Sequence, residues 1–80
     1  MKRIYLKTLR ESQDLSLEEM ASLSEVSYNY ILNIENGHQG DQASFMMMAR
    51  LARAYGITLE DLYRYEYQYL LKKGKIRLND

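Results

Sequence analysis

One spacing pattern between residues 20 and 34 restricts the fold of this chain more than any other feature. Its members are Met20, Ala21, Val26, Ser27, Ile31 and Ile34. A small residue at position 21 allows two helices to approach closely, and Val26 fills the turn between them. Ile31 and Ile34 bury one face of the second helix and leave positions 28, 29, 32 and 33 on its outer face. The pattern therefore predicts two short helices joined by a tight turn.

The rest of the chain also reads as short helices with recognisable ends. Ser16 and Glu19 have the spacing of a capping box, and Ser27, Ser44 and Thr58 are further N-cap candidates. Glycine follows at positions 37 and 56, where helices commonly end. We predict helices over about residues 2–12, 17–23, 27–34, 45–55 and from 59 onward.

Apolar stripes define the predicted inward faces of the last two helices. The fourth helix has Phe45, Met48, Leu51, Ala52 and Tyr55, and the fifth has Leu59, Leu62 and Tyr63. Residues 64–78 fit two structures. Tyrosines at 63, 65, 67 and 69 alternate with polar residues, which favours a strand, whereas apolar spacing and a glycine behind two lysines favour a helix ending near Lys73. The helix is the preferred prediction, with residues 75–78 as a short strand or a tail.

Composition excludes several classes of protein. The chain has 80 residues, which predicts one small domain. It has no cysteine, so disulfide frameworks and thiolate metal sites are excluded. Charged residues interrupt the N-terminus too early for a signal peptide, and no uncharged run approaches the ~20 apolar residues of a membrane span. The expectation is a soluble, cytoplasmic domain without a membrane partner.

The two helices predicted around residues 17–34 have the geometry of a helix-turn-helix, whose second helix can lie in the major groove of DNA. Over about residues 4–63 the chain resembles the Cro/C1-type (phage repressor-like) helix-turn-helix family. The matching segments are LKTLR at 6–10, LSLEEMA at 15–21, VS at 26–27, Ile31, IENG at 34–37 and LARAYGITLEDL at 51–62. The resemblance implies an all-α, compact five-helix bundle over residues 1–63, with a Tyr-rich C-terminal extension over residues 64–80. Members of the family usually bind operator DNA as dimers.

The resemblance also implies roles for individual residues. Arg10, at the end of the first helix, would pair with Glu35, at the end of the recognition helix, and fix the two helices together. Tyr28, Asn29 and Asn33 would read bases, because Asn can bond adenine through two hydrogen bonds and Tyr can pack on a thymine methyl group. The positions that would contact phosphates are Ser16, Ser27 and Asn36.

The chain departs from the family pattern at three places. Leu17 stands where the family often has Gln, which removes a common DNA contact. Glu25 occupies a turn position that favours Gly, at a cost of about 1 kcal/mol if its φ is positive. The loop over residues 38–43 is longer than usual and lacks Lys and Arg. His38, the only histidine, is a poor metal candidate, and no metal or cofactor is expected.

The formal net charge is zero, but the charges are segregated along the chain. Residues 1–10 carry four basic and no acidic side chains, residues 11–49 carry seven acidic side chains and no Lys or Arg, and residues 50–80 carry seven basic and four acidic side chains. Because Lys and Arg neutralise phosphates, the acidic segment argues against tight DNA binding. Positive charge at the DNA would have to come from flanking residues, namely Lys2, Arg3, Lys7, Lys72, Lys73, Lys75 and Arg77.

Two functions fit these features. The first is a sequence-specific DNA-binding transcriptional regulator of bacterial or phage type, such as a repressor, that acts as a homodimer. The alternative is a helix-turn-helix fold used as a protein-interaction module, an antirepressor or DNA mimic, that binds a basic regulatory protein through its acidic 11–49 face. An enzyme is not expected, because the sequence offers no nucleophile–base pair, Gly-rich phosphate loop or metal cluster. Surplus apolar residues predict dimer contacts at Tyr63, Tyr67, Leu70, Leu71 and Ile76.

Overall fold

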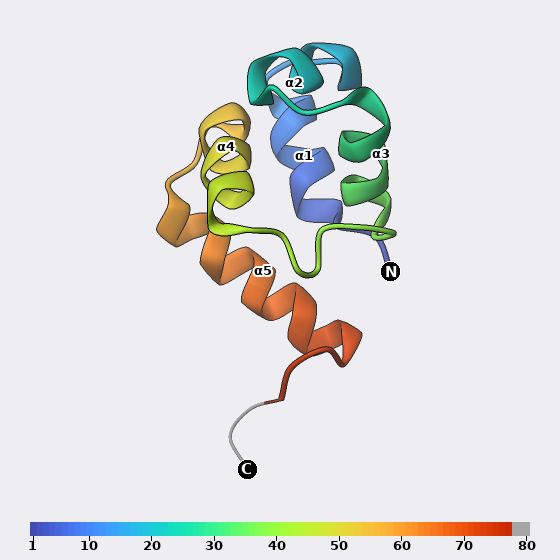
Figure 1. The fold of residues 1–80 in the computed structure, drawn as a ribbon, viewed down its shortest axis with the longest axis vertical. Helices are drawn as coiled ribbons and strands as arrows, with labels where there is room; N and C mark the ends of the chain where they lie inside the picture. Colours follow the sequence, from blue (N-terminus) through green and yellow to red (C-terminus); the bar gives the residue numbers. More distant parts are fainter. Residues whose placement is uncertain (78–80) are drawn as a thin grey trace.

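The computed structural model describes residues 1–77 of the chain and contains five helices (Figure 1). They are α1 (Ile4–Ser12), α2 (Leu17–Ser24), α3 (Tyr28–Asn36), α4 (Phe45–Tyr55) and α5 (Leu59–Lys73). The predicted all-α, five-helix architecture is confirmed. In Figure 1, α1 lies between α3 and α4, α2 crosses one end of the bundle, and α5 extends beyond the other end. Within the described part of the chain, no helix combines the length and the apolar character needed to cross a membrane.

Local side-chain bonds explain where four of the helices begin. The Ser16 hydroxyl accepts the Glu19 N–H at 3.0 Å, and the Glu19 carboxylate accepts the Ser16 N–H at 2.9 Å, so the predicted capping box is present. The other predicted N-caps each accept the N–H three residues later, and they are Ser27, Ser44 and Thr58. Each bond satisfies a backbone donor that would otherwise have no partner at the helix start.

The hydrophobic core lies where α1 to α4 meet the first half of α5. It consists of Leu6, Met20, Ile31, Ile34, Leu51, Ala52, Ala54, Tyr55 and Leu62. Ala21 and Val26 are partly buried against it, as the spacing pattern requires. Phe45 and Tyr63 are not inward, contrary to prediction, because they are 74% and 62% exposed. Periodicity identifies one face of a helix but not how far neighbouring helices cover it, and both side chains line a surface groove instead.

α5 continues as a helix to Lys73, so the strand alternative for the tyrosine-rich segment is wrong. The alternating tyrosines point around the helix rather than to one face. Tyr69 is 5% exposed, whereas Tyr65 is on the surface and stacks on Tyr5, with ring centroids 4.8 Å apart. Of the predicted tail, residues 75–77 form no strand and position 78 lies outside the described residues. The proposed boundary between residues 63 and 64 falls inside α5.

Glu25 ends α2 in the left-handed backbone conformation, with φ at 58°. A side chain with a Cβ atom is disfavoured there, and glycine is not. We expect Glu25→Gly to raise the free energy of unfolding by about 1 kcal/mol, measured by urea denaturation. Glu18→Gly, at an exposed position in the first turn of the same helix, is the control and should lower it by about 1 kcal/mol, because Gly is a poor helix former and the carboxylate near the helix N-terminus is lost. A loss of stability in both variants would contradict the argument.

Candidate nucleic-acid interface

The outer face of α3 is polar and most exposed at its N-terminal end. Ile31 and Ile34 are 0% and 1% exposed, and they fix which face of the helix points to solvent. On the outer face, Tyr28 is 42% exposed and Asn29 is also exposed. Asn33 is half-buried one turn further on. The three residues predicted to read bases therefore follow one another along the solvent side of α3.

The residues predicted to contact phosphates lie at helix ends. Ser16 and Ser27 are the N-caps of α2 and α3, and their hydroxyl oxygens accept N–H groups of Glu19 and Tyr30. Each hydroxyl still has its own proton to donate. Asn36 is half-buried at the last position of α3. The two serine hydroxyls, together with the free N–H groups of two helix starts, suit phosphate oxygens.

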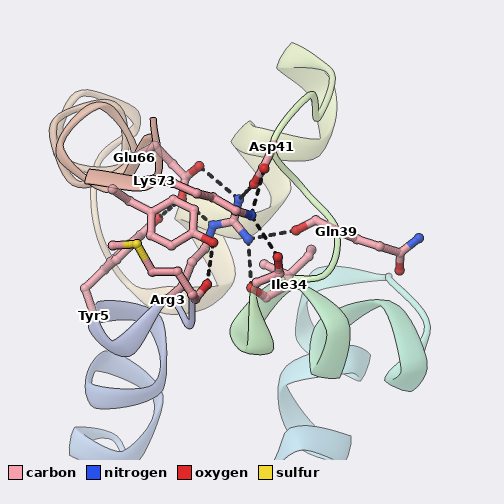
Figure 2. Close-up of polar contacts among 10 residues, drawn as sticks. Arg3, Tyr5, Ile34, Gln39, Asp41, Glu66 and Lys73 are labelled. Carbon is pink, nitrogen blue, oxygen red and sulfur yellow. Dashed lines mark hydrogen bonds and ion pairs between the residues drawn. The ribbon is translucent and has the colours of Figure 1, made fainter. Parts of the chain in front are cut away.

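Gln39 is a neighbour of Asn33 that could not be identified from the sequence. The Asn33 side-chain amide donates to the Gln39 side-chain oxygen at 3.0 Å. In Figure 2 the Gln39 side chain extends away from the protein interior. A paired Asn–Gln arrangement can present both a donor and an acceptor to a base edge. Polarity in the loop was the sole sequence signal, because the contact depends on how the loop turns back toward α3.

Arg10 and Glu35 form a buried ion pair between α1 and α3. Arg10 Nε and Nη2 donate to the two carboxylate oxygens of Glu35 at 2.8 and 3.1 Å. Arg10 Nη1 donates to the carbonyl of Leu15, and the Tyr55 hydroxyl donates to Glu35 at 2.7 Å. The hydrogen bond that Arg10 donates to Glu35 raises the pKa of Arg10, and burial, with Glu35 beside it, raises the pKa of Tyr55. Arg10 thus stays charged, and the pair joins α3 to α1.

Arg3 occupies the interior, although the sequence analysis expected it to face DNA. Its side chain is 1% exposed. Nε donates to Glu66 at 2.6 Å, and Nη2 donates to Asp41 at 2.8 Å (Figure 2). The guanidinium carbon also lies 4.4 Å from the centroid of the Tyr69 ring. The prediction for Arg3 is wrong because its charge is satisfied by carboxylates from the loop and from α5.

Lys73 completes this group from the last turn of α5. Its ammonium donates to Asp41 and to the carbonyl of Gly37, both at 2.8 Å. The hydroxyl of Tyr69 donates to the carbonyl of Met1 at 2.7 Å. We call Arg3, Tyr5, Asp41, Glu66, Tyr69 and Lys73 the Arg3 cluster. It joins the N-terminus, the loop after α3 and the C-terminal half of α5.

Electrostatics favour the charged forms of Arg3, Asp41 and Lys73. Burial opposes the charge on Arg3, but the hydrogen bond and charge of Glu66 outweigh it, so the pKa of Arg3 is raised. Burial also opposes ionisation of Asp41, yet Lys73 and Arg3 together lower the pKa of that carboxyl group. The hydrogen bond to Asp41 raises the pKa of Lys73. Burial, followed by the adjacent Glu66 carboxylate, raises the pKa of Tyr5, which stays a neutral donor.

These ion pairs determine which charged residues remain exposed near α3. Two acidic residues of the 11–49 segment, Glu35 and Asp41, are bound by bases. The exposed acidic residues of that segment are Glu11, Asp14, Glu18, Glu19 and Glu25. Arg3 and Lys73 are not free to meet phosphates, so the exposed basic residues are Lys2, Lys7, Arg50, Arg53, Arg64, Lys72, Lys75 and Arg77. Over residues 1–77 no group of three possible metal ligands occurs.

Comparison with known proteins agrees with this geometry. The helix-turn-helix family model matches residues 6–62. The crystal structure of the clp gene regulator ClgR from Corynebacterium glutamicum is similar, with a TM-score of 0.68 and 23% sequence identity. The similarity covers 86% of this chain and 71% of that one, and it concerns the fold. No curated protein sequence matches the chain.

Proposed function

Because the chain belongs to the Cro/C1-type helix-turn-helix family, we propose that it is a sequence-specific DNA-binding transcriptional regulator whose α3 enters the major groove. The observation that carries the proposal is the outer face of α3, where Tyr28 and Asn29 are exposed beside the N-terminus of the helix. In this arrangement Asn29 and Asn33 read base edges, and the Ser16 and Ser27 hydroxyls contact phosphates.

A substitution at Asn29 tests base reading. We expect Asn29→Ala to weaken binding to the best duplex selected from a random DNA pool by about 1–3 kcal/mol. Binding to a scrambled duplex, and the salt dependence of both, should stay unchanged, because Asn29 carries no charge to neutralise a phosphate. Gel retardation or fluorescence anisotropy measures both affinities.

Gln68→Ala, an amide removed from the exposed surface of α5, is the matched control. It should leave the affinity for the selected duplex unchanged. If the wild-type chain retards no duplex at low salt, the proposal is wrong.

A second candidate function rests on the acidic surface. Glu11, Asp14, Glu18 and Glu25 are all exposed on the α1–α2 side of the molecule. Such a surface suits a basic protein, which would make the fold a protein-interaction module of the antirepressor or DNA-mimic type. Co-purification of the chain with a basic protein would favour this function if Glu25→Lys weakens the complex. A complex unchanged by Glu25→Lys would count against it.

We further propose that two copies associate through the groove between α4 and α5. The groove has a volume of about 700 Å³ and is lined by Phe45, Tyr63, Tyr67, Leu70 and Ile76, among others. α5 has acidic residues in its first turn and lysines in its last. Two α5 helices packed antiparallel would bring these opposite charges together. Four of the five predicted dimer residues line this groove, and Leu71 does not.

Tyr63→Glu tests the association without disturbing the core, because Tyr63 is 62% exposed. We expect it to weaken dimerisation by about 2 kcal/mol or more, as loss of a central aromatic contact does. Sedimentation equilibrium measures the change. Leu23→Glu, at a 56% exposed apolar position on α2, is the control. Deleting the chain after Arg64 would be a poorer test, because it also removes Glu66 and Lys73 from the Arg3 cluster. A dimer unaffected by Tyr63→Glu would contradict the proposed surface.

A further inference from the structure

The C-terminal end of α3 lacks basic residues of its own to stabilise it. The last carbonyls of a helix have no partners within the helix, and the helix dipole favours positive charge there. No basic residue lies in the last turn of α3. The N–H groups of His38 and Gln39 both donate to the carbonyl of Asn33, at 2.8 and 3.3 Å. The Gly37 N–H donates to the carbonyl of Ile34 at 3.1 Å, so the carbonyls from Glu35 onward need donors from elsewhere in the protein.

Arg3 and Lys73 supply these donors from opposite ends of the chain. Arg3 Nη1 donates to the carbonyl of Ile34 at 2.8 Å, and the Arg3 backbone N–H donates to the carbonyl of Glu35 at 2.8 Å. Lys73 Nζ donates to the carbonyl of Gly37 at 2.8 Å. Two cations thus lie against the negative end of the helix dipole of α3.

The same two side chains also fix the loop that follows α3. Arg3 Nη1 donates to the carbonyl of Gln39 at 2.7 Å. Both cations bind Asp41 at 2.8 Å, one on each carboxylate oxygen. Gly40 packs so closely that an added Cβ would lie 3.3 Å from Arg3 Nη1. The position of Gln39 beside Asn33 therefore depends on the Arg3 cluster.

We infer that Arg3 and Lys73 cap the C-terminal end of α3 from outside the helix-turn-helix, and that they are positioning residues for base reading which do not touch DNA. The inference rests on the proposed DNA-binding function. It links α5 to the recognition helix, because α5 carries both Lys73 and the Glu66 carboxylate that holds Arg3. A displacement of α5 is then expected to change the positions of Asn33 and of the loop that follows α3.

The decisive variant is Lys73→Met in the full chain. It keeps most of the side-chain volume and leaves Asp41 bound to Arg3, so the protein is expected to fold. We expect the ratio of selected-duplex to scrambled-duplex affinity to fall about 3- to 10-fold. The slope of log affinity against log salt should not change, because Lys73 neutralises no phosphate. Lys73→Arg should restore the ratio, and Arg50→Met, which removes an exposed charge from α4, should leave it unchanged.

Amide hydrogen exchange gives a readout that needs no DNA. In Lys73→Met the amide of His38 should exchange about 3- to 10-fold faster, while that of Val26, at the end of α2, changes only with global stability. An unchanged affinity ratio, or a salt slope reduced by about 0.9, would overturn the inference, the latter because it indicates a direct phosphate contact. If the wild type binds no DNA, the proposed function fails, and the exchange at His38 alone decides: faster exchange supports the capping role and unchanged exchange refutes it.

Discussion

Replacing Glu66 with alanine is expected to lower the free energy of unfolding by about 3–5 kcal/mol, the usual cost of leaving one partner of a buried ion pair alone. Arg3 is 1% exposed and would lose two hydrogen bonds to this carboxylate. The hydroxyl of Tyr5 would lose its acceptor at the same time. Urea denaturation measures the change, provided that the slope of the transition stays the same.

Glu60→Ala is the matched control, because it removes a carboxylate from the same helix. Glu60 is 75% exposed and pairs with Arg64 at 3.6 Å on the surface. Its loss should cost less than about 1 kcal/mol. If Glu66→Ala cost no more than Glu60→Ala, the Arg3 cluster would not be a major source of stability.

Arg10→Met is expected to have an effect of similar size, about 3–5 kcal/mol. The Glu35 carboxylate is 6% exposed and would keep a single donor, the hydroxyl of Tyr55. The carbonyl of Leu15 would lose its bond from Arg10 as well. The loss of stability should therefore appear as a lower urea midpoint with an unchanged slope.

A second substitution separates the buried charge from the loss of packing. The double variant Arg10→Met with Glu35→Gln removes the unpaired charge and keeps an acceptor for Tyr55. It should regain about 1 kcal/mol or more relative to Arg10→Met alone. Lys7→Met, at an exposed position one turn earlier in α1, is the control and should change stability by less than about 0.5 kcal/mol. A double variant less stable than Arg10→Met would show that the buried charge is not the cause.

Local features of the fold could be predicted from the sequence because their partners are close along the chain. Ser16 and Ser44 bond to an N–H three residues away, so a capping residue followed by an apolar stripe is sufficient evidence. The extent of α5 was also accessible, since Gly74 behind two lysines is a typical helix end. The exposure of Phe45 could not be predicted, because periodicity does not reveal how far another helix covers a given face.

The Arg3 cluster was beyond sequence reasoning for a different reason. Arg3 and Glu66 are 63 positions apart, and Lys73 and Asp41 are 32 apart. Counting charges by segment treats every Lys and Arg as solvated, whereas Arg3 is bound in the interior and the half-buried Lys73 is bound to Asp41. Arg10 and Glu35 are also distant, 25 positions apart, and their pairing was suggested only by the family resemblance.

The capping of α3 by both ends of the chain has a consequence for synthesis on the ribosome. Residues 1–55 contain every side chain proposed to read bases, yet the carboxylate that holds Arg3 and the ammonium that binds Gly37 belong to α5, which is translated after them. Contacts between such distant residues form only after the intervening chain is available. When α1 to α4 have left the ribosome, both helices of the helix-turn-helix are therefore present. The C-terminal end of α3 still lacks its bond from Lys73, and Arg3 still lacks Glu66. Translation of α5 is therefore the step that completes the proposed cap of α3.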